Sequence, residues 1–305
     1  MQRVFNLNLH YVCNNFCVHC ISHNTREKTT VSLDLDQVRK ILSIYSPKEK
    51  DIIILSGGEP SMFPNLSMLL KTIRESSSCK IVMYSNGAGL CTASTAQAVA
   101  RYVDRVTLSY YGDEIIHDRY AGRKGAFAIL KKAVEELIKA REYLTHTCAL
   151  EVKYVRASDD IPLLPLLDGL TTPNQVESVV LSRILSVEVQ CNPVLQQDSA
   201  AMRDILELRE HKRWSRTILK LVDILPCSLG QELFDEIQGD YPQRAVENII
   251  FFDGMYPEGK MIRFSPLALF DRRCSSCGLQ SVCGTTATCY GALRRERGHW
   301  YYAEE

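Results

Sequence analysis

Hydrophobic and polar positions along residues 1–195 follow two periods that replace each other from segment to segment. Short apolar runs are typical of buried strands, and apolar residues that recur every three or four positions are typical of amphipathic helices. The pattern predicts strands at Val4–Tyr11, Asp51–Leu55, Lys80–Tyr84, Arg105–Ser109, Thr147–Val155 and Val176–Leu185. It predicts helices at Leu33–Tyr45, Leu66–Glu75, Ser94–Tyr102 and Ala126–Arg141.

This alternation predicts a parallel α/β sheet, because a strand, a helix and a second strand usually form a right-handed crossover unit. The expected fold class is a partial (βα)6 TIM-like barrel with a small cysteine-rich extension at the C-terminus. Spacing alone does not separate a partial barrel from an open doubly wound sheet. Both architectures place functional residues at the carboxyl ends of the strands.

The character of the chain changes after about residue 195. One helix is predicted from Ser199 to Ile224, followed by irregular segments and an aromatic-rich run at Ile249–Tyr256. We therefore expect two domains. The first is a barrel at residues 1–195, and the second, at residues 196–305, is a helical linker with a cysteine-rich tail.

The composition is ordinary for a globular enzyme, with 46% hydrophobic and 24% charged residues. Lys+Arg and Asp+Glu are equal at 36 each, so no global field attracts nucleic acid or anionic lipid. The N-terminus lacks the apolar region of a signal peptide, and no apolar run in the sequence reaches the length of a membrane span. A cytoplasmic location is expected, with neither nucleic acid nor membrane as a partner.

The chain has twelve cysteines, and in a reducing compartment metal binding explains them better than disulfides do. Cys13, Cys17 and Cys20 lie close together in the loop after the first predicted strand. Three thiolates can hold three irons of a [4Fe–4S] cluster and leave the fourth iron open to another ligand. A zinc site completed by His19 or His23 is the alternative.

The CxxxCxxC spacing of these cysteines, directly after a first strand, resembles the radical S-adenosylmethionine (SAM) superfamily. The resemblance implies that Cys13, Cys17 and Cys20 hold a [4Fe–4S] cluster and that SAM binds its open iron. The residue before the last cysteine is usually aromatic in that family, whereas this chain has His19. The departure changes packing near SAM but removes no ligand.

Glycine and polar residues follow the next predicted strands. Two adjacent glycines at a strand end let the backbone approach a bound molecule closely. The run after the second strand resembles the GGEP motif of the family, which implies that the amino group of SAM is recognised by Gly57, Gly58, Glu59 and Pro60. The same resemblance implies that the ends of the third and fourth strands present to SAM the residues Ser85, Asn86 and Ser109.

The segment after the fourth strand matches the family less closely. His117-Asp118 resembles a pair found in members with auxiliary clusters, but Ala121 stands where those members usually have an arginine, between Arg119 and Arg123. The simpler interpretation, that His117 and Asp118 cap the following helix, is favoured.

Four cysteines form a second group in the tail, at Cys274, Cys277, Cys283 and Cys289. Such a group can fill a zinc site or hold an auxiliary iron–sulfur cluster. Its spacing resembles the SPASM and twitch extensions of radical SAM enzymes, except that the last interval is longer. The resemblance implies one auxiliary cluster, with Cys289 and Cys227 as competing candidates for the last ligand.

The resemblance implies an enzyme that cleaves SAM reductively to a 5′-deoxyadenosyl radical, which abstracts hydrogen from a substrate. The implied electron donor is a protein such as flavodoxin or ferredoxin. In an epimerisation, a cysteine outside the clusters returns a hydrogen atom, and the candidate donors are Cys148, Cys191 and Cys227.

The sequence leaves the substrate open. Enzymes with such extensions often modify ribosomally made peptides by epimerisation, cross-linking or oxidation, and others act on sugars or aminoglycosides. The cluster motif begins at residue 13, which leaves little room for a leader-recognition domain before it and weakens the peptide interpretation. We expect a peptide substrate, with a dehydrogenase or epimerase of a small sugar- or aminoglycoside-type intermediate as the alternative. A non-catalytic zinc or iron–sulfur protein is the second alternative.

Overall fold

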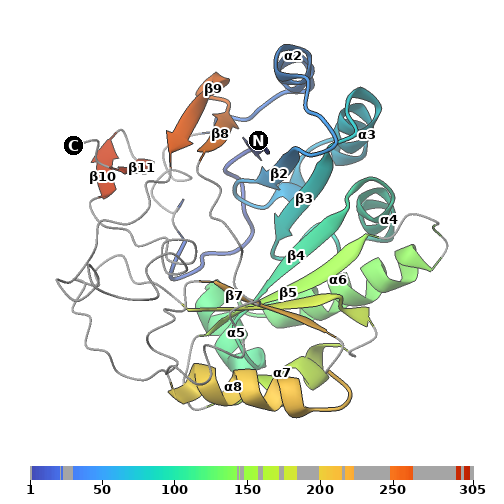
Figure 1. The fold of residues 1–305 in the computed structure, drawn as a ribbon, viewed down its shortest axis with the longest axis vertical. Coiled ribbons are helices and arrows are strands. Elements are labelled where there is room, and N and C mark those ends of the chain that lie inside the picture. Colours follow the sequence, from blue (N-terminus) through green and yellow to red (C-terminus); the bar gives the residue numbers. More distant parts are fainter. Residues whose placement is uncertain are drawn as a thin grey trace.

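A curved, largely parallel sheet organises the computed structural model (Figure 1). The structure describes residues 2–20, 22, 30–142, 144, 148–156, 161–171, 175–183, 199–214, 217–222, 248–263, 293–296 and 299–302. Within these ranges the main sheet has nine strands in the order β7-β6-β5-β4-β3-β2-β1-β8-β9. Their bounds are β1 (Val4–Asn8), β2 (Ile52–Ser56), β3 (Lys80–Ser85), β4 (Arg105–Tyr110), β5 (Ala149–Arg156), β6 (Ser178–Arg183), β7 (Ile218–Val222), β8 (Asn248–Asp253) and β9 (Tyr256–Arg263).

Strand order decides between the two architectures that the sequence left open. Strands β1 to β7 are parallel, and each pairs with its neighbour in the chain. A doubly wound sheet instead reverses its strand order at a switch point. The sheet is not closed, because its edges are β7 and β9. The expected partial TIM-like barrel is therefore confirmed.

Helices cover the outer face of this sheet (Figure 1). The start of the first of them is fixed by a capping box, in which Asp34 accepts a bond from the Gln37 amide (2.7 Å) and the Gln37 side chain accepts one from the Asp34 amide (2.8 Å). The helices are α2 (Leu35–Tyr45), α3 (Leu66–Ser76), α4 (Ala93–Tyr102), α5 (Glu114–Ala121), α6 (Ala126–Arg141), α7 (Leu163–Leu170) and α8 (Ser199–Glu210), with a 3₁₀ turn at Pro60–Met62.

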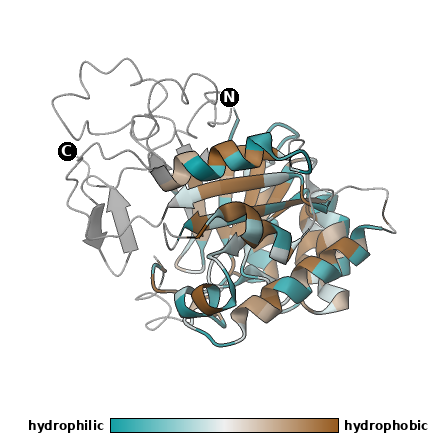
Figure 2. Ribbon diagram, turned by 90° about the horizontal axis from the view of Figure 1, so that it is seen from below, coloured by the Kyte–Doolittle hydropathy of each residue, from teal (hydrophilic) through white to brown (hydrophobic). Residues whose placement is uncertain are grey.

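The apolar core lies between the strands and the helices. Phe5, Leu7 and Leu9 on and after β1 pack into the same buried cluster as Val38 and Ile41 of α2. Figure 2 shows the apolar strands beneath helices that carry polar residues on their outer faces. Because side chains alternate along a strand, the other face of the sheet carries a different set of residues.

That inner face is polar toward the amino-terminal end of the barrel. Glu151 on β5 accepts hydrogen bonds from the hydroxyls of Thr107 (2.8 Å) and Ser178 (2.7 Å). It also forms ion pairs with Lys220 and with Arg105, whose Nε lies 3.8 Å from Oε1. Burial favours the neutral acid, but the two cations outweigh it and lower the pKa of Glu151. A charged network therefore fills the bottom of the barrel, in which Glu151 is fully engaged and Arg105 Nε has no hydrogen-bond partner in the described structure.

One predicted helix is wrong in its second half. Helix α8 ends at Glu210, and the chain turns through Trp214 into strand β7. The Trp214 ring is fully buried and its Nε1 donates to Asp168 (3.0 Å), which anchors the turn. In Ile218–Val222, Leu219 packs into the core while Lys220 reaches Glu151, an alternation typical of a strand.

Elements after residue 195 extend the sheet at both sides. On one side, β7 pairs with β6. On the other side, β8 pairs in parallel with β1, and β9 forms an antiparallel hairpin with β8. The domain boundary near residue 195 stays a prediction, because residues 184–198 and 223–247 lie outside the described ranges. A second small sheet pairs β10 (Leu293–Glu296) with β11 (His299–Tyr302).

Candidate functional site

The cysteine loop leaves β1 at the carboxyl edge of the sheet and is held against the glycine run that follows β2. Gly58 N donates to the carbonyl of His10 (2.6 Å), and Glu59 N donates to that of Val12 (2.8 Å). A side chain at position 58 would overlap the Val12 carbonyl, so glycine is required there for close backbone approach. The two predicted motifs are therefore joined through their backbones.

Three thiols sit on this loop, and neutral hydrogen-bond donors contact two of them, Cys13 and Cys17. Cys13 Sγ accepts from the amide of Asn15 (3.4 Å) and from Asn86 Nδ2 (3.5 Å). The Tyr111 hydroxyl donates to Cys17 Sγ (3.9 Å). Burial raises the pKa of the Cys17 thiol to about 11, with the nearby thiols adding to the effect and the Tyr111 bond opposing it.

The end of α5 and the turn that follows it contact the other side of the cysteine loop through backbone hydrogen bonds. The amides of Phe16 and Val18 donate to the carbonyls of Ala121 (2.9 Å) and Tyr120 (3.0 Å). Gly122 has a φ of 62°, and a side chain there would overlap the Phe16 carbonyl. Ala121, where the family resemblance expects an arginine, contributes its backbone to the loop.

Glu59 joins the ends of β2 and β3 through its carboxylate. It is 1% exposed and accepts hydrogen bonds from the Ser61 amide (3.0 Å), the Ser61 hydroxyl (2.6 Å), the Ser85 hydroxyl (2.6 Å) and the Asn86 amide (2.6 Å). Burial raises the pKa of Glu59, and these donors oppose the rise. Pro60 follows as the first residue of the 3₁₀ turn.

Asn86 continues this network to the thiols. Its Nδ2 donates to Asn14 Oδ1 (2.8 Å) as well as to Cys13 Sγ. Residues from the ends of β1, β2 and β3 are thus linked by consecutive hydrogen bonds. The structure brings together the cysteine, glycine and Ser85-Asn86 motifs that the sequence placed at separate strand ends.

The fourth strand end reaches the thiols through an aromatic residue. Ser109 forms a side-chain hydrogen bond with Tyr111, which contacts Cys17. The ring of His19 packs edge-on against Tyr111, with centroids 4.9 Å apart. Burial, followed by the charge of Lys153 on β5, lowers the pKa of His19. The sequence interpretation missed Tyr111 and Lys153, although the position of Tyr111 directly after β4 was an available signal.

The capping interpretation of His117-Asp118 is confirmed for one residue and wrong for the other. Asp118 accepts from the amides of Gly125 (2.5 Å) and Phe127 (2.9 Å), and so caps α6. His117 is buried, and its Nδ1 accepts from the Tyr111 amide (3.3 Å). Burial lowers the pKa of His117 to about 4, so the ring is neutral near pH 7.

Cys148 is not brought to this site. It precedes β5 at the amino edge of the sheet, opposite the cysteine loop, and burial raises its pKa to about 12. Its role as a hydrogen-atom donor is not supported by any contact with the site. The other cysteines named from the sequence lie outside the described residues: Cys191, Cys227, Cys274, Cys277, Cys283 and Cys289.

The donor set of the loop fits an iron–sulfur cluster. Cys13, Cys17 and Cys20 are all reduced and partly exposed, and thiolates are the usual ligands of such clusters. Each thiolate binds a different iron, so the three need not converge on one point. Among the described residues, no group of three His, Cys, Asp or Glu side chains is arranged to hold a single metal ion. His23, one of the two candidate ligands in the zinc alternative, lies outside the described residues.

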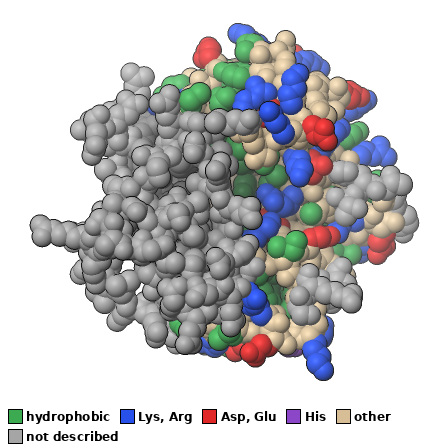
Figure 3. All heavy atoms as spheres, viewed as in Figure 1, with side chains coloured by type: hydrophobic (Ala, Val, Ile, Leu, Met, Phe, Trp, Pro, Cys, Tyr) green, Lys and Arg blue, Asp and Glu red, His purple; other side chains and the backbone are tan. Residues whose placement is uncertain are grey.

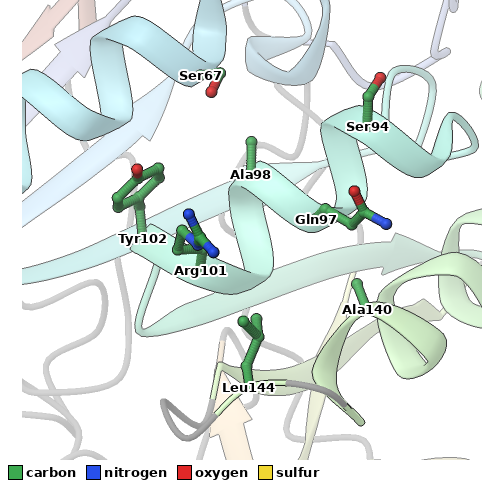
Figure 4. A pocket seen from close by; sticks show the side chains of 8 residues that line it. All are labelled: Ser67, Ser94, Gln97, Ala98, Arg101, Tyr102, Ala140 and Leu144. Carbon is green, nitrogen blue, oxygen red and sulfur yellow. The ribbon is translucent and has the colours of Figure 1, made fainter.

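A hollow elsewhere on the molecule contains none of these residues. It has a volume of about 470 Å³ and lies on the helical layer, among side chains of α3, α4, α6 and Leu144 (Figure 4).

Lysine, arginine and acidic side chains are interspersed on the described part of the face in Figure 3. No helix among the described residues is both long and apolar enough to cross a membrane.

Fold and site together define a partial parallel α/β barrel protein with three free cysteines in one loop at the carboxyl edge of its sheet. Residues 7–150 match the family model of the Radical SAM superfamily. These residues form a domain of this superfamily, and the family implies a [4Fe–4S] cluster and SAM.

Similar proteins come from sequence and from structure. The chain is 30% identical over 129 residues to an AdoMet-dependent heme synthase of Methanosarcina barkeri, a match that spans 42% of this chain and only 37% of that relative. Its fold resembles anSMEcpe with bound AdoMet (TM-score 0.62, 12% identity, 93% of this chain and 88% of that one). It also resembles Streptococcus suis SuiB bound to the precursor peptide SuiA (TM-score 0.57, 16% identity, 99% and 74%).

Proposed function

We propose that this radical SAM enzyme modifies a ribosomally made peptide, by epimerisation, cross-linking or oxidation. The observation that carries the enzymatic part is the hydrogen-bond path from Glu59 through Asn86 to Cys13, which ties SAM-type motifs to the thiolates. A purely structural cysteine site needs no such link to a buried carboxylate at the end of the neighbouring strand.

The residues of the chain hold and shape the centre. When bound, the [4Fe–4S] cluster and SAM supply reductive C–S cleavage and a radical that removes hydrogen from a C–H bond. Asn15, Asn86 and Tyr111 donate hydrogen bonds to the sulfurs, and such bonds tune the potential of a cluster. The Glu151 network links β4, β5, β6 and β7 at the amino-terminal end of the barrel and so supports the strands that carry the site.

Support for a peptide substrate is the likeness of the fold to SuiB bound to a precursor peptide, over nearly the whole chain. A tetrapyrrole is a second candidate, because the sequence match is to an AdoMet-dependent heme synthase. That match covers only 129 residues, 42% of this chain and 37% of the relative. It therefore supports shared SAM chemistry more strongly than a shared substrate.

The tail completes the proposal. Cys274, Cys277, Cys283 and either Cys289 or Cys227 bind one auxiliary iron–sulfur cluster, with zinc as the alternative. An electron carrier such as flavodoxin or ferredoxin reduces the N-terminal cluster. Cys191 and Cys227 remain candidate hydrogen-atom donors.

Metal content tests the proposed centres. After anaerobic reconstitution we expect about eight irons per chain, falling to about four when Cys13, Cys17 and Cys20 are all replaced by alanine. If the wild type binds about four irons and the triple variant binds none, the tail holds zinc or no metal. Iron absent from both proteins contradicts the proposed enzyme.

Substrate class is tested by 5′-deoxyadenosine formation with dithionite as the reductant. Candidate precursor peptides, aminoglycosides and iron-coproporphyrin are added separately, and a substrate is recognised by faster deoxyadenosine release together with a mass change in the added compound. A mass change in the porphyrin or the aminoglycoside alone contradicts the peptide proposal.

A further inference from the structure

Three apolar side chains of the cysteine loop are exposed at the surface. Val12, Phe16 and Val18 are 58%, 57% and 73% exposed. They flank and separate Cys13 and Cys17, so they lie beside the proposed cluster. Exposed apolar side chains gathered in one loop are typical of an interaction surface, whereas single scattered ones are ordinary.

A basic turn adjoins this loop. Arg119, Arg123 and Lys124 are exposed at and after the end of α5. The backbone bonds from Phe16 and Val18 to residues 120–121 hold this turn against the loop. Arg123 Nη1 also donates to the carbonyl of Asn14 (3.3 Å), between the first two cysteines.

Within the described ranges, three exposed cations on the outer helices are paired with acids, unlike Arg119 and Lys124. Exposed Arg39, Lys71 and Lys139 each pair with an acid one turn away on their own helix. Among the described residues, neither Arg119 nor Lys124 forms such an ion pair.

The nearby acids are engaged in capping or lie farther along the helix. Asp118 caps α6, and Asp113 caps the opposite end of α5, where Glu114 follows it. The end of α5 beside the cysteine loop therefore presents net positive charge.

We propose that the exposed apolar residues of the cysteine loop and the basic α5–α6 turn form the docking surface of an acidic electron-carrier protein. The inference rests on the proposed function, which requires such a carrier. A small apolar centre with a charged rim suits a transient redox encounter, in which rim charges set the association rate. In the encounter the carrier loses one electron and the cluster beside the surface gains it, with no bond made or broken.

Charge reversal tests this surface on the full-length, reconstituted protein. The test variant is Arg119→Glu/Lys124→Glu, which leaves Arg123 and its bond to the loop intact. The matched control is Arg101→Glu/Lys40→Glu, which reverses one arginine and one lysine, both exposed, on α4 and α2. The probe is flavodoxin, used oxidised for binding and reduced for turnover.

Binding is measured by titration calorimetry at low and at high ionic strength. We expect the affinity for oxidised flavodoxin to fall about tenfold in the test variant and less than about twofold in the control at low salt. The difference should shrink at high salt, because exposed charges are screened. Replacing an exposed apolar side chain of the loop, in Val18→Ser, should weaken flavodoxin binding about threefold at both salt concentrations, because no charge is changed.

Turnover separates this inference from the proposed function. With reduced flavodoxin the test variant should form 5′-deoxyadenosine more slowly than wild type, whereas with dithionite the two rates should agree. Equal flavodoxin affinities in the test and control variants, or no flavodoxin binding by the wild type at low salt, overturn the docking surface. Absence of deoxyadenosine with dithionite in the wild type instead overturns the proposed function.

Discussion

The two edges of the barrel sheet are built from different interactions. At the amino edge, three acids that precede even-numbered strands each pair with an arginine: Arg3–Asp51 (2.5 Å), Arg74–Asp104 (2.6 Å) and Arg141–Glu177. Each acid also accepts a backbone amide at the start of the preceding strand, from Arg3 (3.0 Å), Ile81 (2.7 Å) and Leu150 (2.6 Å) respectively. The same arrangement of an ion pair and a backbone hydrogen bond recurs three times along the amino edge and links the strands in pairs.

The carboxyl edge has no comparable set of ion pairs among the site residues described. The buried carboxylate of Glu59 is satisfied by neutral donors, and the Cys13 and Cys17 thiols accept from amides and a phenol. Outside these site residues, the same edge also holds a buried Arg156–Asp204 ion pair at the end of β5 and Asp253 at the end of β8, which accepts from the Tyr11 hydroxyl (2.6 Å). Asn8 Oδ1 and His19 Nδ1 are buried there without a hydrogen-bond partner in the described structure. The comparison teaches that strand pairing is secured at one edge, which leaves polar groups at the other available for a ligand.

The largest effect is expected from Gly58→Ala. The new methyl group would overlap the Val12 carbonyl and push the cysteine loop off its backbone partners. We expect iron bound by the N-terminal cluster to fall by more than about half, and deoxyadenosine formation to fall about a hundredfold. Gly169→Ala in α7 is the control, because nothing lies near its added methyl group. Full iron content in Gly58→Ala would falsify the inference that the cysteine loop must approach the backbone of residue 58 closely.

The next effect is expected from Glu59→Gln. The amide nitrogen cannot accept the hydrogen bond that the Asn86 amide now donates, so the link from Glu59 to Cys13 is disturbed. SAM affinity, measured by calorimetry on reconstituted protein, should fall about tenfold or more. Glu75→Gln, on the exposed face of α3, should leave SAM affinity unchanged. If the two variants bind SAM equally well, the carboxylate has no part in forming the site.

Sequence reasoning was most accurate where a single period governed a segment. The strands and helices up to residue 141 were predicted to within a few residues, except that short α5 was missed, because alternation and helical spacing were both clear. The segment at 199–224 failed because Ile218–Val222 is apolar enough to continue a helical pattern, and only its pairing with β6 makes it a strand.

Site prediction succeeded through strand ends rather than through contacts. The cysteine, glycine and Ser85-Asn86 motifs could be placed at one edge because parallel strands share their direction. The hydrogen bonds from the loop to the carbonyls of residues 120 and 121 could not be predicted, since any residue supplies such backbone groups. Cys148 was misleading for the opposite reason, because its residue type suggested chemistry while its position is at the amino edge.

A smaller effect is expected at the amino edge from Asp51→Asn. Arg3 and backbone amides lower the pKa of Asp51 to about 2, against the opposing effect of burial. A depressed carboxyl pKa stabilises the fold above the unfolded value near 4, and the contribution is lost as pH falls toward 2. Because Arg3 is partly exposed, we expect a loss of about 1–2 kcal/mol at pH 7.

Urea unfolding at two pH values measures the contribution of Asp51. The difference between wild type and Asp51→Asn should shrink by about half at pH 3. Iron content and SAM affinity should not change, because the pair lies at the edge opposite the site. A pH-independent difference would mean that the hydrogen bonds of Asp51, rather than its charge, stabilise the strand pair.

The smallest effect is expected from Asp118→Ala, and it separates position from function. Asp118 lies at the carboxyl edge beside the turn that contacts the cysteine loop, yet its two oxygens cap α6. Removing a helix cap costs about 1 kcal/mol, which urea unfolding would detect. Asp113→Ala, which removes the cap of α5, provides a matched loss of similar size. SAM affinity within about twofold of wild type in both variants would assign Asp118 to stability alone, whereas a selective tenfold loss in Asp118→Ala would extend the site to the start of α6.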